Sequence, residues 1–443
     1  MARLQTRTRR APLSLQRPTA VTTTANLVIL GGYLLSGVVS ARALGPAGRG
    51  QLTVVMLWSG LIHVVGTYGL QSSCSYHLAR WPDRRTALVT WLGRIAIRQV
   101  LTMTAVSAAF LYWLRLRLHL APVLAIESTT WPAAMTLVAY GASCAQGMAD
   151  FRRFNLIRVI SGATPAVLMT VGALSLRLTP ADAVAAYLVP AWCGAAIACA
   201  WLRQAAKAPW ADPPTRRERR AMLSYGWRSL ASHSGLTLNN SSDQLTLALL
   251  VPASAVGLYT VSSTASSPLP FLIASFGMVG LPTVTALAGP AKAGATSRVL
   301  KRAACLLALA APPLAALLPW CIPLLYGRRY SAAVVPAELL LLGRIFAAMT
   351  RVTDDLLRAH GLPGFGSIAQ GAGAIVTITG TLLFARAAHP LAAVSAVSSL
   401  GFALTFLLAL TRLWAATRRL VPGHAVRGGP VGRDTEGRAQ DSV

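Results

Sequence analysis

Long apolar segments alternate with short polar ones along almost the whole chain. A helix needs about 20 apolar residues to cross roughly 30 Å of hydrocarbon, and about twelve segments reach that length. Their predicted cores lie at residues 20–41, 52–73, 95–114, 121–145, 157–176, 182–202, 228–250, 257–288, 303–325, 333–356, 367–387 and 391–413. The pattern predicts an all-α integral membrane protein with about 12 transmembrane helices.

The composition supports this class of protein. Hydrophobic residues make up 54% of the 443 residues and charged residues only 12%, whereas soluble proteins average about 25% charged residues. The mean hydropathy is +0.54. The first apolar segment is too long for a removable signal peptide and lacks a small-residue cleavage site, so we interpret it as the first span.

The chain is strongly basic, with 41 Lys and Arg against 13 Asp and Glu and a formal net charge of +28. Such an excess could reflect binding to nucleic acid or anionic lipid, or it could reflect membrane topology. If the amino terminus is inside, most basic residues fall in inner segments. The outer exceptions are Arg42, Arg49, Arg115, Arg117, Arg177, Arg328, Arg329 and Arg386. This bias predicts an inner (plasma) membrane protein with both termini cytoplasmic, and it argues against a nucleic-acid partner.

A basic polar segment divides the apolar segments into two sets of six. It spans residues 203–223 and includes APWADPPTRRERR, whose prolines and charges are typical of a solvated linker. We therefore predict a six-helix bundle at 19–202, a cytoplasmic linker at 203–223 and a second six-helix bundle at 224–417. The ends, residues 1–18 and 418–443, are predicted to be disordered.

The two halves carry a short internal repeat. The segment LGPAGRGQLTVV (44–55) resembles LVPASAVGLYTV (250–261), and each copy lies between the first and second span of its half. After a one-residue gap, Gly50 pairs with Gly257. Many transporters consist of two homologous bundles that face a central site, so the repeat favours that organisation.

The sequence contains no clear catalytic or metal-binding motif. The six cysteines lie in or at the edges of apolar segments without CxxC spacing, and the seven histidines are scattered. DDLLRAH (354–360) is not the DDxxD motif of prenyl-transfer enzymes, and the GAGA cluster (371–374) is better explained by close helix packing. We predict no enzyme activity, no catalytic residues, no metal and no cofactor.

The seventh span has an unusual polar stretch, residues 239–244, in the middle of its apolar run. A charge near the bilayer centre costs about 2.5–3.5 kcal/mol, so Asp243 is expected to face protein or water. Helical spacing places a polar stripe on one face, made of Arg228, Ser232, Gly235, Asn239, Asp243 and Thr246. The stripe predicts a hydrated cavity. The alternative is a break between two short helices that are capped by Asn and Ser.

The first span has a milder polar stripe, and it contains no carboxylate. The stripe consists of Thr22, Asn26, Tyr33, Ser36 and Ser40 and ends at Arg42. The first half offers only Glu127 and Asp182 near the membrane, both close to the predicted outer surface. A proton- or sodium-driven exporter usually needs a buried acidic residue in this bundle, so the composition of the first half argues against that class.

Arginines also occur within other spans. Arg344 and Arg351 lie seven residues apart on one face of the tenth span, with Asp355 a turn below. Arg351 could pair with Asp355, or the two arginines could form a column exposed to a cavity, where they would attract phosphate. Arg94 and Arg98 lie at the inner end of the third span, and we expect them to snorkel to the lipid headgroups.

Several of these segments together resemble the polysaccharide flippase family, part of the superfamily of multidrug, oligosaccharidyl-lipid and polysaccharide exporters. The segments are ARALGPAGRGQLTVV (41–55), residues 239–244 followed by SAVGLYTVSSTAS (254–266), LLYGRRYSAAVVPAELLLLG (324–343) and LLRAHGLPG (356–364). The resemblance implies two six-helix bundles packed as a V around a central cavity. It also implies transport by alternating access of an oligosaccharide attached through pyrophosphate to a polyprenyl lipid, from the inner to the outer leaflet, for surface polysaccharide biosynthesis.

Such a substrate needs cationic side chains for its pyrophosphate and a hydrated route for its sugars. The candidate binding residues are Arg42, Arg49, Arg228, Asn239, Asn240, Asp243, Arg344 and Arg351. In relatives the aspartate of the seventh span is commonly followed by Arg or Lys, whereas Gln244 follows Asp243 here. The charge would then come from the other arginines. Arg42 and Arg49 could hold the pyrophosphate at the outer mouth, or they could simply anchor the helices there.

The resemblance also implies partners and leaves alternatives. The expected partners are the lipid-linked oligosaccharide, membrane lipid, and a polysaccharide polymerase or glycosyltransferases. A small-molecule or drug antiporter of the same superfamily is one alternative. A lipid II flippase is another, although such proteins usually carry two extra spans. A membrane-embedded enzyme or assembly factor of glycan synthesis is the alternative from a different class.

Overall fold

The computed structural model describes residues 16–175, 177–205, 212–270, 272–273, 284–285, 287–362, 364–418 and 420. All regular structure in these ranges is helical, as predicted. The predicted disordered ends lie mostly outside the described residues, as do the middle of the linker and much of the eighth predicted span.

The first half of the chain contains α1 (Gln16–Gly66), α2 (Leu70–Arg80), η1 (Pro82–Arg84), α3 (Arg85–Leu118), α4 (Pro122–Ser128), α5 (Trp131–Gly147), α6 (Phe151–Ser175) and α7 (Pro180–Ala205). The second half contains α8 (Arg216–Leu250), α9 (Ala253–Ala265), α11 (Gly289–Tyr326), η2 (Arg328–Ala333), α12 (Val334–Ala359), α13 (Phe365–Phe384) and α14 (Pro390–Arg418). Eight helical segments among the described residues are long and apolar enough to cross a membrane. The chain is therefore a multi-pass membrane protein.

The segment labelled α1 contains two predicted spans. Its 51 residues would extend about 77 Å as a straight helix, far more than a bilayer is thick. The chain reverses at Gly45, whose φ of 66° and ψ of −180° are not helical, and Pro46 follows directly. Before the reversal, Thr22 accepts a hydrogen bond from Asn155 near the start of α6. After it, Gly66 is contacted by Gln99 of α3. The predicted connection between the first two spans is thus a sharp turn.

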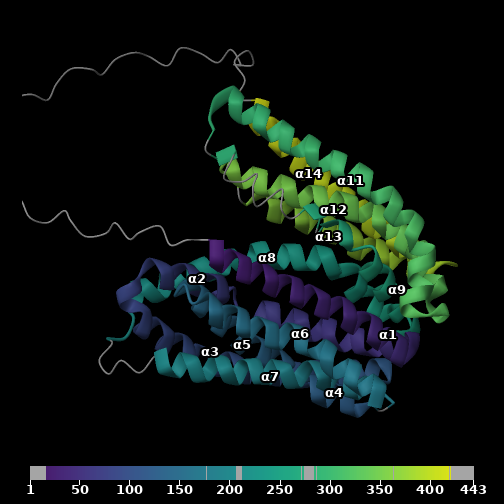
Figure 1. The fold of residues 1–443 in the computed structure, drawn as a ribbon, viewed down its shortest axis with the longest axis horizontal. Helices are drawn as coiled ribbons and strands as arrows, with labels where there is room; N and C mark the ends of the chain where they lie inside the picture. The colour runs from purple at the N-terminus through teal and green to yellow at the C-terminus, as the bar shows by residue number, and fades with distance from the viewer. Residues whose placement is uncertain are drawn as a thin grey trace, which may run out of the picture.

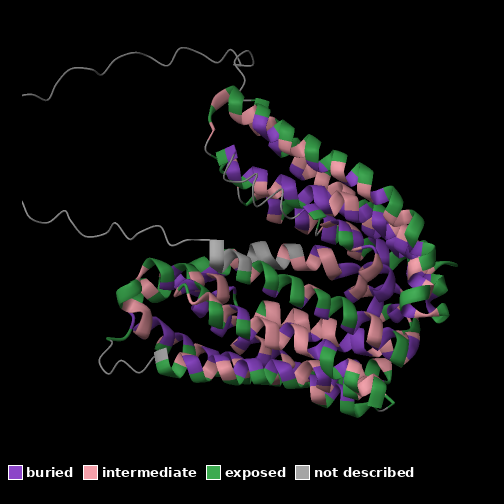
Figure 2. Ribbon diagram, viewed as in Figure 1, coloured by how far each residue is buried: buried purple, intermediate pink, exposed green. Residues whose placement is uncertain are grey.

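The helices form two groups that are arranged as a V (Figure 1). Helices α2 to α7 lie in one group and α11 to α14 in the other, with α8 along the line between them. The groups converge near α9 and the turn of α1 and diverge toward the opposite end. Each group has its own buried core, and Figure 2 shows buried residues within both groups and at the closed end. This arrangement confirms the predicted V-shaped pair of bundles.

The closed end of the V is formed by the two copies of the internal repeat. A Cβ at Gly50 would overlap the carbonyl oxygen of Ala253, and a Cβ at Gly257 would overlap that of Pro46. The contact is reciprocal, because the Cβ position of each glycine also lies 3.0 Å from the backbone nitrogen of the other. Small residues permit such close backbone approach between membrane helices. The glycines that pair in the sequence alignment therefore cross each other in space, and we call this contact the outer seam.

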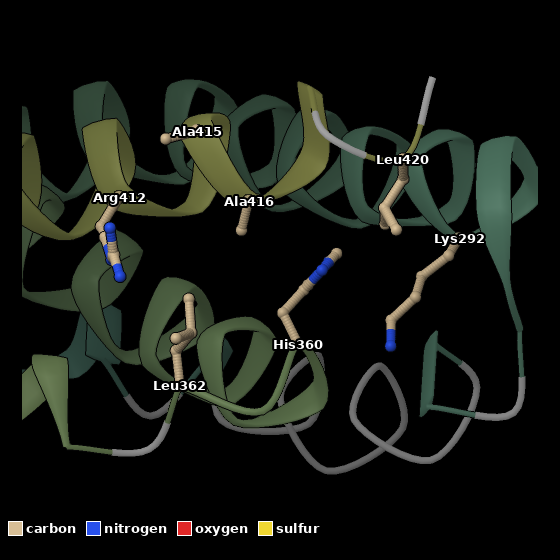
Figure 3. Close-up of a pocket in the computed structure, with 7 residues that line it drawn as sticks. All are labelled: Lys292, His360, Leu362, Arg412, Ala415, Ala416 and Leu420. Carbon is tan, nitrogen blue, oxygen red and sulfur yellow. The ribbon is translucent and has the colours of Figure 1, made fainter. Parts of the chain in front are cut away.

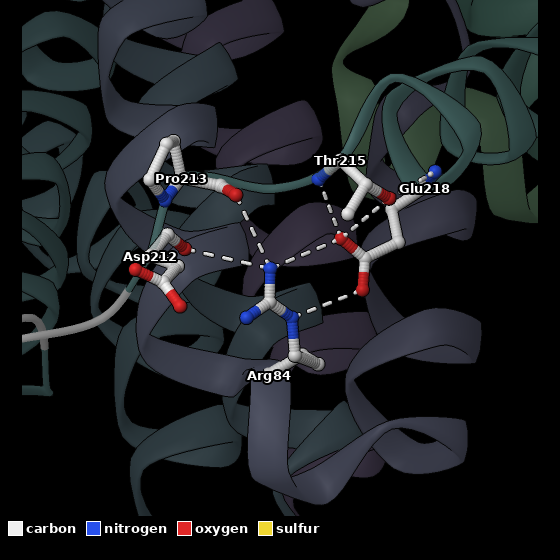
Figure 4. A network of polar contacts seen from close by, with 5 residues as sticks. All are labelled: Arg84, Asp212, Pro213, Thr215 and Glu218. Carbon is white, nitrogen blue, oxygen red and sulfur yellow. Dashed lines mark hydrogen bonds and ion pairs between the residues drawn. The ribbon is translucent and has the colours of Figure 1, made fainter.

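A second connection ties the start of α8 to the first bundle (Figure 4). The Arg84 guanidinium donates to both carboxylate oxygens of Glu218, at 3.0 and 3.2 Å. It also donates to the carbonyl oxygens of Asp212 and Pro213. Glu218 and Thr215 form a reciprocal capping box at the first turn of α8. Bidentate pairs of this kind have a defined geometry, so they hold the end of the linker in place.

Helix α8 then passes from one bundle to the other. Near its start, the backbone oxygen of Met222 accepts a hydrogen bond from Ser73 of α2 at 2.8 Å. Further along, Gly235 packs closely against the backbone of Ser367 in α13. The predicted boundary at residue 224 lies inside this continuous helix, so α8 belongs to both bundles.

The outer seam can be tested with a matched pair of glycine substitutions. We expect Gly50→Ala to destabilise the protein in detergent by about 1–3 kcal/mol, because the new Cβ has no space against the backbone of α9. Gly60→Ala is the control, since nothing lies within 4 Å of a Cβ there. That change should be neutral or gain up to about 1 kcal/mol of helix stability. Equal unfolding temperatures for the two variants would contradict the seam.

Candidate functional site

Asp243, in the polar stretch of α8, is buried inside the second bundle. Its carboxylate accepts hydrogen bonds from the Tyr259 hydroxyl at 2.6 Å and the Ser398 hydroxyl at 3.1 Å. The backbone N–H of Gln244 donates to the other oxygen at 2.7 Å. The side chain of Asp243 is only 1% exposed. It therefore joins α8 to α9 and α14 instead of lying on a hydrated wall.

Arg344 of α12 lies close to this carboxylate and is also buried. One guanidinium nitrogen donates to the Ser263 hydroxyl at 2.8 Å, and the guanidinium carbon lies 5.4 Å from the centre of the Phe402 ring. The negative charge of Asp243 acts on this guanidinium. The buried Nε atom has no hydrogen-bond partner among the described residues. Asp243 and Arg344 therefore provide charges of opposite sign inside one bundle.

A second polar chain crosses the same bundle about one helical turn away. The Asn239 amide donates to Gln370 at 2.5 Å and to Thr405 at 3.3 Å. Gln370 in turn donates to Asp354 of α12 at 3.4 Å. The backbone of Gly373 lies so close that a Cβ there would meet Asn239 and Thr405. Close packing thus accounts for part of the GAGA cluster, as expected.

The remaining predicted residues of α8 and α12 are more accessible. Arg228 is exposed and Asn240 is half-buried, while Arg351 is exposed. Asp355 pairs with Arg358 at 3.5 Å, so the alternative in which Arg351 pairs with Asp355 is not observed. The stripe on α8 is therefore divided into an exposed cation and two buried polar groups. The Ser232 side chain lies outside the described residues. Because α8 is continuous from Arg216 to Leu250, the alternative of two short helices is not observed.

The polar stripe of the first span lies beside α6, where sequence reasoning missed a cation. Arg158 donates to the amide oxygen of Asn26 at 2.8 Å and lies over the Phe154 ring. Its charge also acts on the neighbouring Tyr33. Asn26 and Tyr33 are exposed and Arg158 is half-buried. The signal was present in the sequence, because Asn155, Arg158 and Ser161 recur every three residues along α6.

Arg42 and Arg49, in the connection between the first two spans, lie at the outer seam. Arg42 donates to the carbonyl oxygens of Leu324 and Leu325, which belong to the last turn of α11 and have no helical partner. Arg49 is partly buried and donates to the Ser40 hydroxyl at 2.8 Å. Both arginines therefore have structural partners, as the anchoring alternative requires. They also lie beside a basic pocket.

This outer pocket has a volume of about 440 Å³. It is lined by Ala41, Arg42, Gly45, Tyr326, Gly327, Arg328, Arg329 and Tyr330, so three arginines and no acidic residue face it. The charge of Arg49 also acts on Tyr326 and Tyr330. Arg328 and Arg329 belong to the GRRY part of the segment LLYGRRYSAAVVPAELLLLG (324–343). The fold brings Arg328 and Arg329 next to Arg42, although they lie almost 300 positions away in the sequence.

The fold defines the class of protein as a helical, multi-pass membrane protein with two facing bundles. One solved structure with this fold is a multidrug resistance MATE family transporter of the MOP superfamily in its inward-facing conformation. It has a TM-score of 0.70 and 13% sequence identity, and the match covers 87% of this chain and 95% of that one. Another is the lipid II flippase MurJ in an inward closed conformation, with a TM-score of 0.68, 13% identity and coverage of 91% and 89%. An outward-facing MATE family transporter fits less well, with a TM-score of 0.57 and 14% identity over 90% and 94% of the two chains.

A family profile described as polysaccharide biosynthesis protein matches residues 15–288, more than half of the chain. The chain belongs to this polysaccharide biosynthesis family. No sequence among the curated proteins is similar enough to count as a match.

The buried carboxylate network can be tested by a double-mutant cycle. Asp243→Ala leaves two buried hydroxyl groups without their acceptor, so we expect a loss of about 1–3 kcal/mol of stability in detergent. Tyr259→Phe should cost less, and the double variant should lose less than the sum of the two. The half-buried neighbour variant Asn240→Ala serves as the control. Strictly additive losses would contradict the direct contact.

Proposed function

We propose that this protein flips a polyprenyl-pyrophosphate-linked oligosaccharide from the inner to the outer leaflet by alternating access, for surface polysaccharide biosynthesis. The observation that carries this proposal is the absence of carboxylates from five helices of the first bundle. Helices α1, α2, α3, α5 and α6 contain no Asp or Glu, whereas Arg158 lies on the polar face of α1 and α6. An anionic headgroup is compatible with such a surface, and a cation is not.

The acidic residues elsewhere in the first half lie in short helices, at a helix start or in connections, and two of them have local partners. The exception inside a short helix is Glu127 of α4, whose Oε2 atom has no hydrogen-bond partner among the described residues. Asp182, at the start of α7, accepts hydrogen bonds from the backbone and hydroxyl of Thr179 at 2.8 and 2.7 Å. Asp150, between α5 and α6, pairs with Arg153 at 2.8 Å. These carboxylates therefore cap or join helix ends. Arg158 has no acidic hydrogen-bond partner among the described residues, which favours a pyrophosphate over a cationic drug.

The positive-inside bias supports an orientation in which the open end of the V faces the cytoplasm. The linker end of α8 carries Arg216, Arg217, Arg219 and Arg220 at this end, and α1 begins and α14 ends there as well. The better fit to an inward-facing transporter agrees with this orientation. The proposed state is therefore open to the inner leaflet of the plasma membrane, where the lipid-linked sugar would enter.

The two arginine sites suggest successive positions for the pyrophosphate. Arg228 is exposed and Arg158 is half-buried, while Arg42 and Arg49 lie at the outer seam. In the inward state Arg42 holds the end of α11. When the seam opens, its guanidinium would be released from those carbonyls and could receive the anion. No bond of the substrate is broken, so the protein acts as a transporter and not as an enzyme, beside the polymerase or glycosyltransferases that make and use the substrate.

Export of a small molecule in exchange for a cation is the second candidate. The second bundle favours it, because Asp354 is a partly buried carboxylate whose Oδ1 atom has no hydrogen-bond partner among the described residues. The likeness to multidrug transporters is equally compatible with it. Reconstitution of the purified protein in liposomes separates the two functions.

The proposed function predicts that purified protein in liposomes exposes a fluorescent polyprenyl-pyrophosphate-linked oligosaccharide to a quencher added outside. Arg158→Gln with Arg228→Gln should slow flipping by roughly tenfold or more, because each charge-assisted contact contributes about 1.5–3 kcal/mol. Arg94→Gln with Arg98→Gln is the matched control, since it removes two exposed arginines that we expect to lie among lipid headgroups.

Two outcomes would contradict the proposal. Cation-dependent efflux of a dye without movement of the sugar lipid would assign the antiporter function. If the protein flips a lipid II analogue and not the oligosaccharide lipid, its substrate is the cell-wall precursor instead. Equal rates in the two double variants would remove Arg158 and Arg228 from the substrate path.

A further inference from the structure

A second basic pocket lies at the open end of the second bundle, away from the cations proposed to contact substrate. It has a volume of about 280 Å³ and lies between the first turns of α11, the end of α12 and the last turns of α14. Its lining includes Lys292, His360, Arg412, Leu362, Ala416 and Leu420. Figure 3 shows these side chains around a common space. We call it the inner basic pocket.

Two permanent cations face this pocket from different helices. The Lys292 ammonium donates to the backbone oxygen of Ala359 at 2.8 Å, which leaves two of its three donors for another group. The Arg412 guanidinium lies 5.8 Å from the centre of the Phe365 ring and makes no hydrogen bond to a described residue. Its five N–H donors therefore remain available.

The third polar group is a neutral donor or acceptor. The Nε2 atom of His360 lies 3.0 Å from the Thr296 hydroxyl. Burial and the nearby Lys292 charge lower the pKa of His360, so the imidazole is neutral at neutral pH. The positive charge of the pocket therefore comes from Lys292 and Arg412.

No acidic residue lines the pocket. The carboxylates of the neighbouring helix end have other partners, because Asp355 pairs with Arg358 and Asp354 accepts a hydrogen bond from Gln370. Arg412 and Lys292 lie on opposite sides of the pocket (Figure 3), so an anion between them would be attracted from both sides. The described residues supply no such anion.

The apolar side of the pocket and the exposed aromatic and basic residues near it indicate a ligand at the membrane surface. Leu362, Ala416 and Leu420 form an apolar side next to the cations. Trp414 lies two positions after Arg412 in α14 and is exposed. The guanidinium of Arg418 lies over the Trp414 ring. Exposed Trp and basic residues at a helix end are typical of the headgroup region.

From these observations we propose that the inner basic pocket binds a phosphate-class anion, with Lys292 and Arg412 as its cationic contacts. The volume is slightly below the 300–1,000 Å³ that is typical of pockets for drug-sized molecules, so it suits a headgroup or a small phosphate ester. The pocket lies between α11, α12 and α14, so a bound anion would hold three helices of the second bundle together. This site goes beyond the proposed transport function and does not depend on it.

Binding can be measured by native mass spectrometry of the full-length protein in detergent. The probes are phosphatidylglycerol, zwitterionic phosphatidylcholine, and inorganic phosphate. We expect Lys292→Gln with Arg412→Gln to weaken the tightest phosphatidylglycerol binding by about tenfold or more. Lys301→Gln with Arg302→Gln is the matched control, because it removes two exposed charges from α11 outside the pocket.

The arms of the experiment identify the source of the phosphate. Variant-sensitive binding of phosphatidylglycerol that inorganic phosphate does not displace would assign a lipid headgroup. Variant-sensitive binding of inorganic phosphate would assign a soluble anion to the same site. Equal affinities in the two double variants, or equal binding of phosphatidylcholine, would overturn the proposal. Arg412→Gln alone gives the same test without disturbing the contact between Lys292 and α12.

Discussion

The close approach of Gly50 and Gly257 is the contact on which the rest of the structure depends. Two helices can cross with backbone in contact only where neither carries a side chain, and here the two glycines occupy equivalent positions in the two halves. The crossing closes one end of the V and leaves the other end open, so the bundles can diverge from a common point (Figure 1). Around it, Tyr330 donates to Ala41 and Arg42 to the end of α11, which adds polar contacts between the halves.

The two bundles are alike in fold and different in electrostatics. The second bundle contains buried carboxylates, and Asp243 accepts hydrogen bonds from Tyr259, Ser398 and the backbone N–H of Gln244. The first bundle has a polar face with a cation, Arg158, and no carboxylate in α1, α2, α3, α5 or α6. A buried network of hydrogen bonds makes one bundle a rigid body, while the positive face of the other provides an attractive surface for an anion. This asymmetry is what favours a lipid-linked pyrophosphate over a cationic substrate.

The fold could be predicted from the sequence because its main signals are local. Span length, charge bias and the repeated connection depend on consecutive residues, and the pairing of Gly50 with Gly257 followed from alignment alone. The site could be predicted only in part. A helical stripe shows that Asp243 shares a face with Arg228. It does not show that α9 and α14 cover Asp243 and leave Arg228 exposed. The partners of Arg42 lie more than 280 positions away, and no local pattern identifies them.

The central claim is that the repeat copies close the outer end while the inner end is open. Paired spin labels can measure this in liposomes, in protein whose native cysteines have been replaced. One pair is placed at the exposed positions Ala47 and Ser254, beside the seam, and the other at the exposed positions Thr90 of α3 and Ser297 of α11, on the open side. Without substrate, the account predicts a short, narrow distance distribution for the first pair and a longer one for the second. A longer distance across the outer pair than across the inner pair would contradict it.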